Sequence, residues 1–281
     1  MHSADLFLLV MFASAFGAGA IGALVGLGGG VLIVPILTIG FNLDIRLAIG
    51  ASIVSVIATS SGAGAALVRD RLTNVRIATL LQVATVCGAI GGAIIAPHIG
   101  TRLLFFLFGG ILLFSAMPMI RKVSQDVPTG LVNDKWAEKF RLANSYPDRQ
   151  RGAEISYAVT GVPLGFSLMF VAGIVSGLLG IGSGALKVLA MDTGMKLPIK
   201  VSSATSNFMI GVTAAASAGI YFWRGEVLPF VAAPVALGVL AGSILGAHML
   251  VRFRSGTIRV AFTIMLIGVA IEMLLRGFGI A

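Results

Sequence analysis

The sequence is poor in charged residues, histidine and cysteine, and each scarcity excludes a class of protein. Asp, Glu, Lys and Arg make up 11% of the 281 residues, whereas soluble globular domains carry about 25%. One cysteine excludes an intrachain disulfide, and with three histidines it leaves few ligands for a metal. Cys87 lies inside an apolar segment, where we expect a small buried thiol. The sequence therefore predicts no metal and no cofactor.

Acidic residues are nearly absent from the apolar segments as well. Glu272 is the exception, and it precedes Arg276 by one helical turn, where a local ion pair is expected. No other carboxylate is available there as a proton relay. No nucleophile–base pair or phosphate-binding loop occurs either, so the sequence does not predict an enzyme.

Long apolar runs take the place of the missing charge. The mean hydropathy is +1.02, and 57% of the residues are hydrophobic. Because a helix needs about 20 apolar residues to cross a bilayer, these runs predict an all-α polytopic membrane protein. The runs are Leu6–Ile39, Leu47–Val68, Ile77–Pro97, Leu103–Ile120, Ile155–Met191, Val201–Phe222, Leu228–Leu250 and Ile258–Leu275.

A single sizeable polar stretch divides the chain into three parts. We expect a first transmembrane part over residues 1–120, a charged cytoplasmic linker over residues 121–154 and a second transmembrane part over residues 155–281. Within the linker, Trp136–Leu142 places aromatic side chains beside lysine and arginine. This composition predicts a short amphipathic turn at the membrane interface.

The two transmembrane parts are related by an internal repeat. A shift of 154 residues aligns the chain with itself without gaps, and Gly26, Gly28 and Gly30 then fall on glycines of the second half. The aligned pairs include Gly26 with Gly180, Gly28 with Gly182, Gly30 with Gly184, Phe12 with Phe166, Ser52 with Ser206, Thr59 with Thr213, and Gly88 with Gly242.

The count of lysine and arginine favours two inverted repeats. If the long first run of each half is a hairpin, fifteen basic residues lie on the linker side and four on the other side. If each run crosses once, the halves are parallel and the counts are twelve and seven. Because cytoplasmic loops are enriched in Lys and Arg, we expect inverted repeats with the N-terminus outside. Each repeat then has a glycine-broken hairpin followed by three transmembrane helices.

The glycine breaks are the first candidate site. Non-helical backbone within a bilayer is tolerated where it is buried in protein or lines a cavity, and paired breaks in repeats mark transporter binding sites. The helix that restarts after each break offers free N–H groups and the positive end of its dipole, which suit an anion. The alternative is close helix packing, which we expect for Gly88, Gly92, Gly242 and Gly246.

Polar residues near the breaks extend this site. Lys187 follows the second break, where its repeat partner is Ile33, and a lysine at membrane depth is expected to be functional. The alternative is that Lys187 snorkels to the membrane edge near Asp192. Most hydroxyl groups are expected to bond within their own helices, and those that begin their segments are the best candidates for an oxyanion. The predicted substrate-binding residues are Gly28, Gly29, Gly30, Ser52, Gly182, Ser183, Gly184, Lys187, Thr205, Ser206 and Asn207.

Four stretches of the chain resemble the sulfite exporter TauE/SafE family. They are "GALVGLGGGVLIVPIL" at Gly22–Leu37, "AIGASIVSV" at Ala48–Val56, "SGLLGIGSGALKVLAM" at Ser176–Met191 and "SSATSNF" at Ser202–Phe208. The resemblance implies a secondary carrier in the bacterial inner membrane for small sulfur-containing anions: sulfite, sulfoacetate, thiosulfate or other organosulfonates. The family's usual direction is export, and a cell that is negative inside expels an anion downhill.

Two other functions stay open at this point. One is an uptake permease for another small anion or a metal ion, although the apolar segments lack the acidic residues that a cation requires. The other is a membrane scaffold or assembly protein, for which the linker is the only candidate docking surface. The expected partners are a small anionic substrate and the lipid bilayer, with no nucleic acid, and a homodimer is left open.

Overall fold

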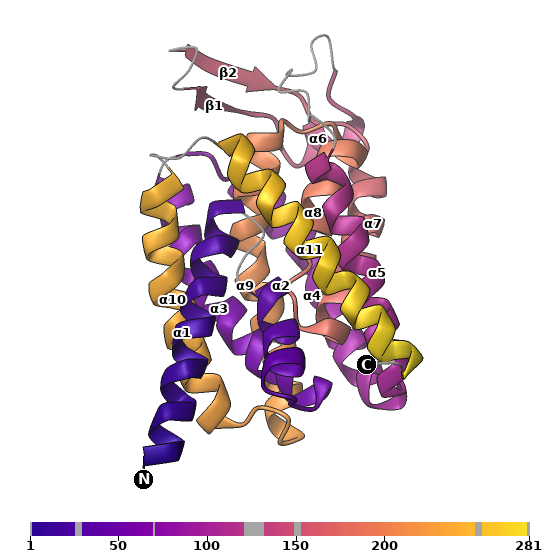
Figure 1. Cartoon of the computed structure of the whole chain (residues 1–281). Coiled ribbons are helices and arrows are strands. Elements are labelled where there is room, and N and C mark those ends of the chain that lie inside the picture. Colours follow the sequence, from indigo (N-terminus) through magenta and orange to yellow (C-terminus); the bar gives the residue numbers. More distant parts are fainter. Residues whose placement is uncertain are drawn as a thin grey trace.

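The protein is a bundle of helices with a small β-hairpin at one end (Figure 1). The computed structural model describes residues 2–25, 30–69, 71–120, 132–148, 153–250 and 255–279. The helices are α1 (His2–Val25), α2 (Gly30–Pro35), α3 (Ile45–Arg69), α4 (Val75–Ile95), α5 (Thr101–Ile120), α6 (Lys135–Lys139), α7 (Val162–Leu179), α8 (Gly184–Leu189), α9 (Ile199–Trp223), α10 (Pro229–Leu250) and α11 (Ser255–Phe278). The π-turns are η1 (Ile36–Gly40) and η3 (Ala190–Gly194), the 3-10 turn is η2 (Ala96–His98), and the strands are β1 (Asn144–Asp148) and β2 (Ala153–Tyr157).

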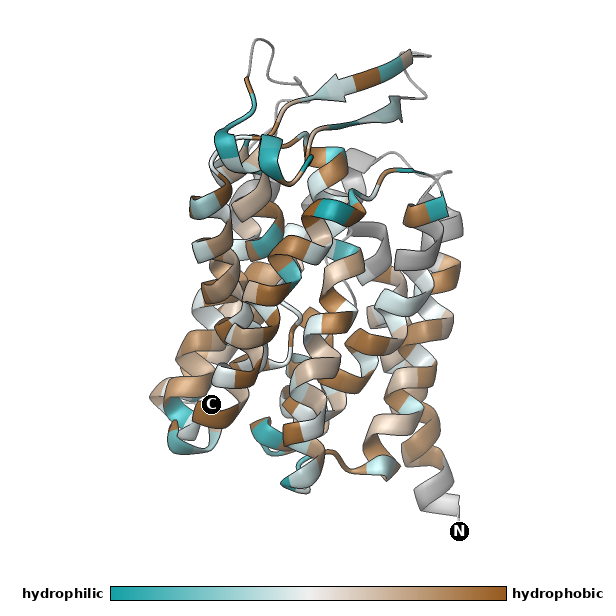
Figure 2. Cartoon of the chain, turned by 180° about the vertical axis from the view of Figure 1, so that it is seen from behind, coloured by the Kyte–Doolittle hydropathy of each residue, from teal (hydrophilic) through white to brown (hydrophobic). Residues whose placement is uncertain are grey.

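The outer surface of the bundle is apolar along the helices, and hydrophilic residues gather at its two ends and on the hairpin (Figure 2). Within the described residues, three stretches are long and apolar enough to cross a membrane: Ile45–Gly62, Val75–His98 and Val162–Leu179. Large apolar side chains such as Leu237 and Ile264 are exposed on other helices. Exposed apolar surface of this extent suits contact with lipid.

Several element boundaries in the two halves of the chain agree at an offset of 154 residues, from the ends of α1 and α7 to the ends of α3 and α9. α2 and α8 begin at Gly30 and Gly184, and both continue directly into a π-turn of five residues. The backbone leaves η1 through Asn42, with φ of 51°, and leaves η3 through Lys196, with φ of 58°. These two residues are also 154 positions apart. The two halves therefore follow the same local path from α2 and α8 onward.

One end of the bundle carries the linker, and we call it the linker end. There the turn before α4 contacts the linker, because Asn74 Nδ2 donates hydrogen bonds to Leu142 O and to Tyr157 Oη, both at 2.8 Å. The turn after η3 lies at the same end, where Thr160 N donates to Met195 O at 3.3 Å. Figure 1 shows this end at the top.

The opposite end gathers the first turn of α3, the end of α4 and the end of α9. Arg46 Nη2 donates to Pro97 O and Ile99 O, and Arg224 Nη2 donates to Ala93 O at 2.7 Å. The first break hairpin returns to this end as well, because Arg276 Nη1 donates to the Thr38 carbonyl of η1 at 2.9 Å. The hairpin of α1 and α2 therefore returns to the opposite end, and the hairpin of α7 and α8 returns to the linker end (Figure 1).

Helices pack between the halves more than within them. α1 packs on α10, α4 on α7, α3 on α9 and α5 on α11. Glycines allow the first two of these close approaches: a Cβ at Gly88 or Gly92 would collide with the α7 backbone, and one at Gly242 with the α1 backbone. The packing role predicted for these three glycines is confirmed. Gly246 lies outside the residues whose surroundings are described.

The linker differs from the expectation of an all-helical chain. The amphipathic turn is confirmed as α6, which Asp134 caps by accepting a hydrogen bond from the Ala137 N–H group. The strands β1 and β2, however, form an antiparallel hairpin in which Tyr146 pairs with Ile155. The predicted fifth apolar run therefore begins as a strand, and its helix starts only at Val162.

Linker side chains share a hydrophobic core with the end of the second broken helix. The buried members Leu142, Tyr146 and Tyr157 pack in one cluster with Met191 and Met195. The linker is thus part of the folded bundle over its described residues. The alternative scaffold function required an exposed docking surface on the linker, and it stays open, because Val132, Trp136 and Phe140 are exposed there.

Cys87 is exposed, and the expectation of a buried thiol is wrong. It lies on α4 on the same side as Val83, Ile90 and Ile94, whose large hydrophobic side chains are also exposed. These positions recur three or four residues apart and therefore form one helix face. This face of α4 points away from the bundle, and a thiol on such an apolar surface suits contact with lipid.

Candidate functional site

The two breaks meet at Ser52. Its Oγ lies 3.0 Å from Gly30 O and 2.9 Å from Gly180 O, so one hydroxyl group links the start of α2 to the end of α7. The repeat partner Ser206 donates to Gly184 O at 3.1 Å. The structure therefore brings together Gly30, Ser52 and Gly180, while substrate binding by these residues stays a prediction. Gly28 and Gly29 lie outside the described residues.

The second break is a left-handed turn. Gly180, Gly182 and Ser183 have φ of 65°, 69° and 46°. Ser183 is a non-glycine residue in a costly conformation, and its Oγ donates to Ala172 O on α7 at 2.6 Å. Its hydroxyl is therefore used to hold the turn. No side chain caps the start of α8 at Gly184. The first backbone N–H groups of α8 therefore lack the hydrogen bond that a capping side chain usually accepts.

Lys187 is fully buried, with 0% of its surface exposed. Its Nζ donates to Thr213 Oγ1 on α9 at 2.8 Å. The alternative that it snorkels to the membrane edge is wrong, because none of the side chain reaches the surface. In the described part of the chain no carboxylate forms an ion pair with it. Lys187 thus places a cationic group inside the bundle with only neutral partners.

Thr213 is the centre of a small polar cluster. Its Oγ1 accepts from Lys187 and from Gln82 Nε2, at 3.0 Å, and donates to Met209 O at 2.8 Å. Thr85 Oγ1 lies 3.3 Å away. Gln82 Oε1 is buried and has no partner among the described residues. We call Gln82, Thr85, Lys187 and Thr213 the Lys187 cluster.

The Lys187 cluster draws on both halves of the chain, and the repeat does not reproduce it. Its members Lys187, Thr85 and Gln82 fall on Ile33, Val239 and Ala236 in the repeat alignment. Sequence reasoning identified Lys187 but missed Gln82 and Thr85. Their spacing of three residues, which places both on one face of α4, was the signal that could have found them.

Thr205 and Asn207 serve contacts between helices at the linker end. Thr205 Oγ1 accepts a hydrogen bond from Asn74 N at 3.1 Å, in the turn before α4. The backbone carbonyl of Asn207 accepts from Ser60 Oγ on α3 at 2.6 Å. These bonds position α9 against α3 and α4. They do not bring the Thr205 hydroxyl group to the Lys187 cluster.

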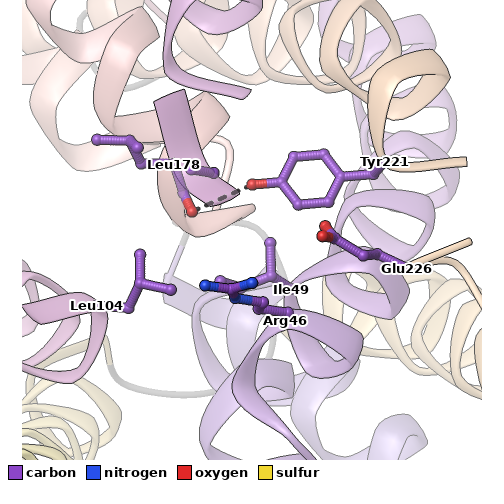
Figure 3. Close-up of a pocket in the computed structure, with 7 residues that line it drawn as sticks. Arg46, Ile49, Leu104, Leu178, Tyr221 and Glu226 are labelled. Atoms are coloured by element: carbon purple, nitrogen blue, oxygen red, sulfur yellow. Dashed lines mark hydrogen bonds between the residues drawn. The ribbon is translucent and has the colours of Figure 1, made fainter. Parts of the chain in front are cut away.

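A pocket lies beside the second break, at the opposite end of the bundle (Figure 3). Arg46 and Glu226 point into it, and Tyr221 Oη donates to Gly177 O and to Leu178 O at 2.7 and 3.2 Å. Sequence reasoning counted Arg46 only as a loop charge and missed the others. The lining residues are Arg46, Ile49, Ala96, Leu104, Leu178, Tyr221 and Glu226.

The chemistry of these sites favours an anion. Among the described residues, no group of three or more His, Cys, Asp or Glu side chains could hold a metal ion. Cationic and neutral donors dominate instead, from Lys187 in the bundle and Arg46 at its end. Donors of this kind hold oxyanions through charge-assisted hydrogen bonds.

Comparison with known proteins agrees with a membrane transporter. The chain is 26% identical over 267 residues to the probable membrane transporter protein YunE of Bacillus subtilis (strain 168), covering 92% of this chain and 94% of the relative. It is 26% identical over 243 residues to the probable membrane transporter protein YdhB of the same organism, covering 86% and 88%. No solved structure matches the chain. Residues 11–273 match the family described as Sulfite exporter TauE/SafE, and the chain therefore belongs to this family of membrane transporters.

Proposed function

We propose that the protein is a secondary transporter that exports small sulfur oxyanions or organosulfonates, such as sulfite or sulfoacetate. The observation that carries this proposal is Lys187, which is fully buried and bonded to the Thr213 hydroxyl group. A buried charge without a counter-charge is costly. An anion that enters the bundle beside Lys187 removes this cost, whereas a cation increases it.

The anion site combines Lys187 with the second break. Lys187 lies in the first turn of α8, and helical side chains lean toward the N-terminus of their helix, where α8 has no side-chain cap. Backbone N–H groups and the ammonium group would then share the oxygen atoms of one oxyanion. Each hydrogen bond to a charged group contributes about 1.5–3 kcal/mol. Gly30 and Ser52 complete the site from the first break, which Ser52 joins to Gly180.

Alternating access would follow from two inverted repeats that rock against each other. Three observations support this arrangement: the element boundaries agree at one offset, helices pair between the halves, and the two break hairpins return to opposite ends. The close packing of Gly30 and Gly182 against Val56 would then belong to one state of the cycle.

The charge distribution supports a cytoplasmic linker in a bacterial inner membrane. The linker end would face the cytoplasm, since it holds most of the loop lysines and arginines. A membrane potential that is negative inside drives a monovalent anion outward with about 2.3 kcal/mol per 100 mV. Export by this route requires no coupling ion, in agreement with the absence of a membrane carboxylate relay.

Flux measurements in proteoliposomes test this function. Sulfite and sulfoacetate efflux would be recorded under an imposed potential for the wild type and for Lys187→Met. We expect efflux that follows the potential and falls about tenfold or more in Lys187→Met, because a charge-assisted bond to the anion is lost. The matched control is Ile33→Met at the equivalent position of the first repeat, which should retain wild-type flux.

Two results would contradict the proposal in different ways. Wild-type flux in Lys187→Met would remove Lys187 from the site. No flux of any sulfur oxyanion by the wild type would overturn the substrate class and favour uptake of a different solute or a scaffold function.

A further inference from the structure

Two arginines with incompletely used N–H donors lie at the opposite end of the bundle: Arg46 lines the pocket, and Arg224 lies against the ring of its lining residue Tyr221. Arg46 Nη2 is held by Pro97 O and Ile99 O at 3.3 and 3.1 Å, while its Nε is buried and has no partner among the described residues. Arg224 Nη2 is held by Ala93 O, while its Nε and Nη1 are likewise buried and unpartnered. Each guanidinium group is therefore held in place by one nitrogen atom and keeps other N–H donors for a ligand. Buried donors without partners are costly, so a ligand that accepts hydrogen bonds from them would be stabilised.

We propose that Arg46 and Arg224 form a second binding site for the transported oxyanion, at the end of the bundle away from the linker. This inference rests on the proposed function and adds a second binding site to the transport pathway. A guanidinium group binds an oxyanion through two parallel N–H donors. Arg46 and Arg224 supply such donors from the first turn of α3 and the C-cap of α9, and both interact electrostatically with Glu226.

The charge balance of the pocket favours an anion. Arg224 Nη2 lies 3.9 Å from Glu226 Oε2, which is too long for a hydrogen bond. The single negative charge of Glu226 therefore balances the two positive charges of Arg46 and Arg224 only in part. Burial raises the pKa of Glu226, and Arg224 and Arg46 oppose this shift. Asp44, the other acid nearby, is exposed and accepts a hydrogen bond from the Arg46 backbone N–H group at 2.8 Å.

The arginine site lies next to the second break. Leu178 and Ile49 line the pocket. Ile49 also packs against Gly180, since a Cβ added at Gly180 would lie 2.8 Å from the carbonyl oxygen of Ile49. Tyr221 connects the two regions, since its Oη donates to Gly177 O and its ring stacks under Arg224 at 4.8 Å. An anion released from the break toward this end would therefore meet Arg46 and Arg224 next.

The repeat reproduces the arginine site only in part. Arg46 falls on Lys200, but Arg224 and Glu226 fall on Asp70 and Leu72, so the linker end lacks the second arginine and the glutamate at the equivalent positions. The two arginines would thus collect or release the anion on one side of the membrane only.

Calorimetric titration of the purified, detergent-solubilised protein with sodium sulfite tests the inference. We expect two sites in the wild type. Arg46→Gln and Arg224→Lys should each weaken one site about tenfold or more, and Glu226→Gln should tighten that same site by removing a competing carboxylate. Lys187→Met should remove the other site. The matched control is Arg102→Gln, which removes an exposed positive charge from the first turn of α5 and should change neither site.

The outcomes separate this inference from the proposed function. A single wild-type site that Lys187→Met abolishes and Arg46→Gln leaves intact would overturn the arginine site and keep the transporter site. Weaker binding in Arg46→Gln together with weaker binding in Glu226→Gln would also overturn it, since both would then act by supporting the fold. No sulfite binding by the wild type would overturn the proposed function and the arginine site together.

Discussion

A single hydroxyl group, that of Ser52, holds the two breaks together. It contacts the carbonyl groups of Gly30 and Gly180, whereas Ser206 contacts only Gly184 O among the described residues. Ser52→Ala would leave two buried carbonyl groups without this donor and should lower the free energy of unfolding by about 1–3 kcal/mol. Ser206→Ala should have a smaller effect. The midpoint of thermal unfolding in detergent measures both.

The control for Ser52 is Ser61→Ala. Ser61 is exposed and donates to Ile57 O within its own helix at 2.8 Å, so its removal should leave the midpoint unchanged. Equal midpoints for Ser52→Ala and Ser61→Ala would show that the bond between the breaks does not stabilise the fold.

Gly180 is required by the backbone as well as by the space around it. Its φ is 65°, and a Cβ would lie 2.8 Å from Ile49 O. A left-handed conformation costs an L-residue about 1–2 kcal/mol, and the steric conflict adds to this cost. Gly180→Ala should therefore lower the thermal midpoint and the sulfite flux.

Gly219→Ala is the matched control, because Gly219 lies within α9 and a Cβ there meets nothing within 4 Å. The higher helix propensity of alanine should leave its stability equal to that of the wild type or up to about 1 kcal/mol higher. A lower thermal midpoint in Gly219→Ala, together with an unchanged midpoint in Gly180→Ala, would contradict this account of the break.

Individual residues could be predicted from the sequence where their type conflicts with their surroundings. Lys187 stood out as a lysine in an apolar run, and the structure places it fully inside the bundle. The cluster residues Gln82 and Thr85 did not stand out, because their contacts with Thr213 on α9 depend on tertiary packing. Arg46 and Arg224 looked like ordinary loop charges for the same reason.

At the scale of elements, the broken helices were predictable and the hairpin was not. Four glycines in five residues conflict with a continuous helix, and the resulting breaks recur at Gly30 and Gly184. Strand β1, "NSYPD", contains proline and three polar turn-forming residues, so it lacks the alternation that predicts a strand. Its position is set by the packing of Tyr146 and Tyr157 on the bundle.

The hairpin is attached to α4 through Tyr157, whose hydroxyl group accepts a hydrogen bond from Asn74 Nδ2. Burial raises the pKa of Tyr157 from 10.0 to about 12, opposed by this bond. The folded state therefore favours the neutral phenol, and the stability that this provides is present below pH 10 and is lost as the pH rises toward 12. The difference in unfolding midpoint between the wild type and Tyr157→Phe should shrink across this range.

High pH acts on the whole protein, so only the difference between the two proteins is informative. Tyr157→Phe retains the buried ring and removes the ionisable group. A constant difference between the two midpoints from pH 8 to pH 12 would show that ionisation of Tyr157 does not couple to folding.

At the scale of the whole molecule, the distribution of charge predicted more than any single motif. The count of loop lysines and arginines favoured inverted repeats, and in the structure the two break hairpins return to opposite ends of the bundle. The pairing of α1 with α10 and of α4 with α7 could not be predicted, because eight apolar runs of similar composition allow many packing orders. Glycine stripes identify a contact face but not its partner.

The membrane orientation of the repeats can be decided with one matched pair of residues. Asn42 and Lys196 are equivalent in the repeat, both are exposed, and both adopt a left-handed backbone conformation after a π-turn. In a Cys87→Ser background, Asn42→Cys and Lys196→Cys would be labelled in intact cells with a thiol reagent that does not cross the membrane. Inverted repeats predict that only Asn42→Cys is labelled, and that Lys196→Cys reacts after the membrane is permeabilised.

Because the two substitutions replace residues of the same local conformation, differences in strain or reactivity should be small, and the side of the membrane should decide the result. Asn144→Cys, at an exposed position of the hairpin, reports the side of the linker and should behave like Lys196→Cys. Labelling of Asn42→Cys and Lys196→Cys from the same side would instead require parallel repeats. The two break hairpins would then open to one side, and rocking of inverted halves could not provide alternating access.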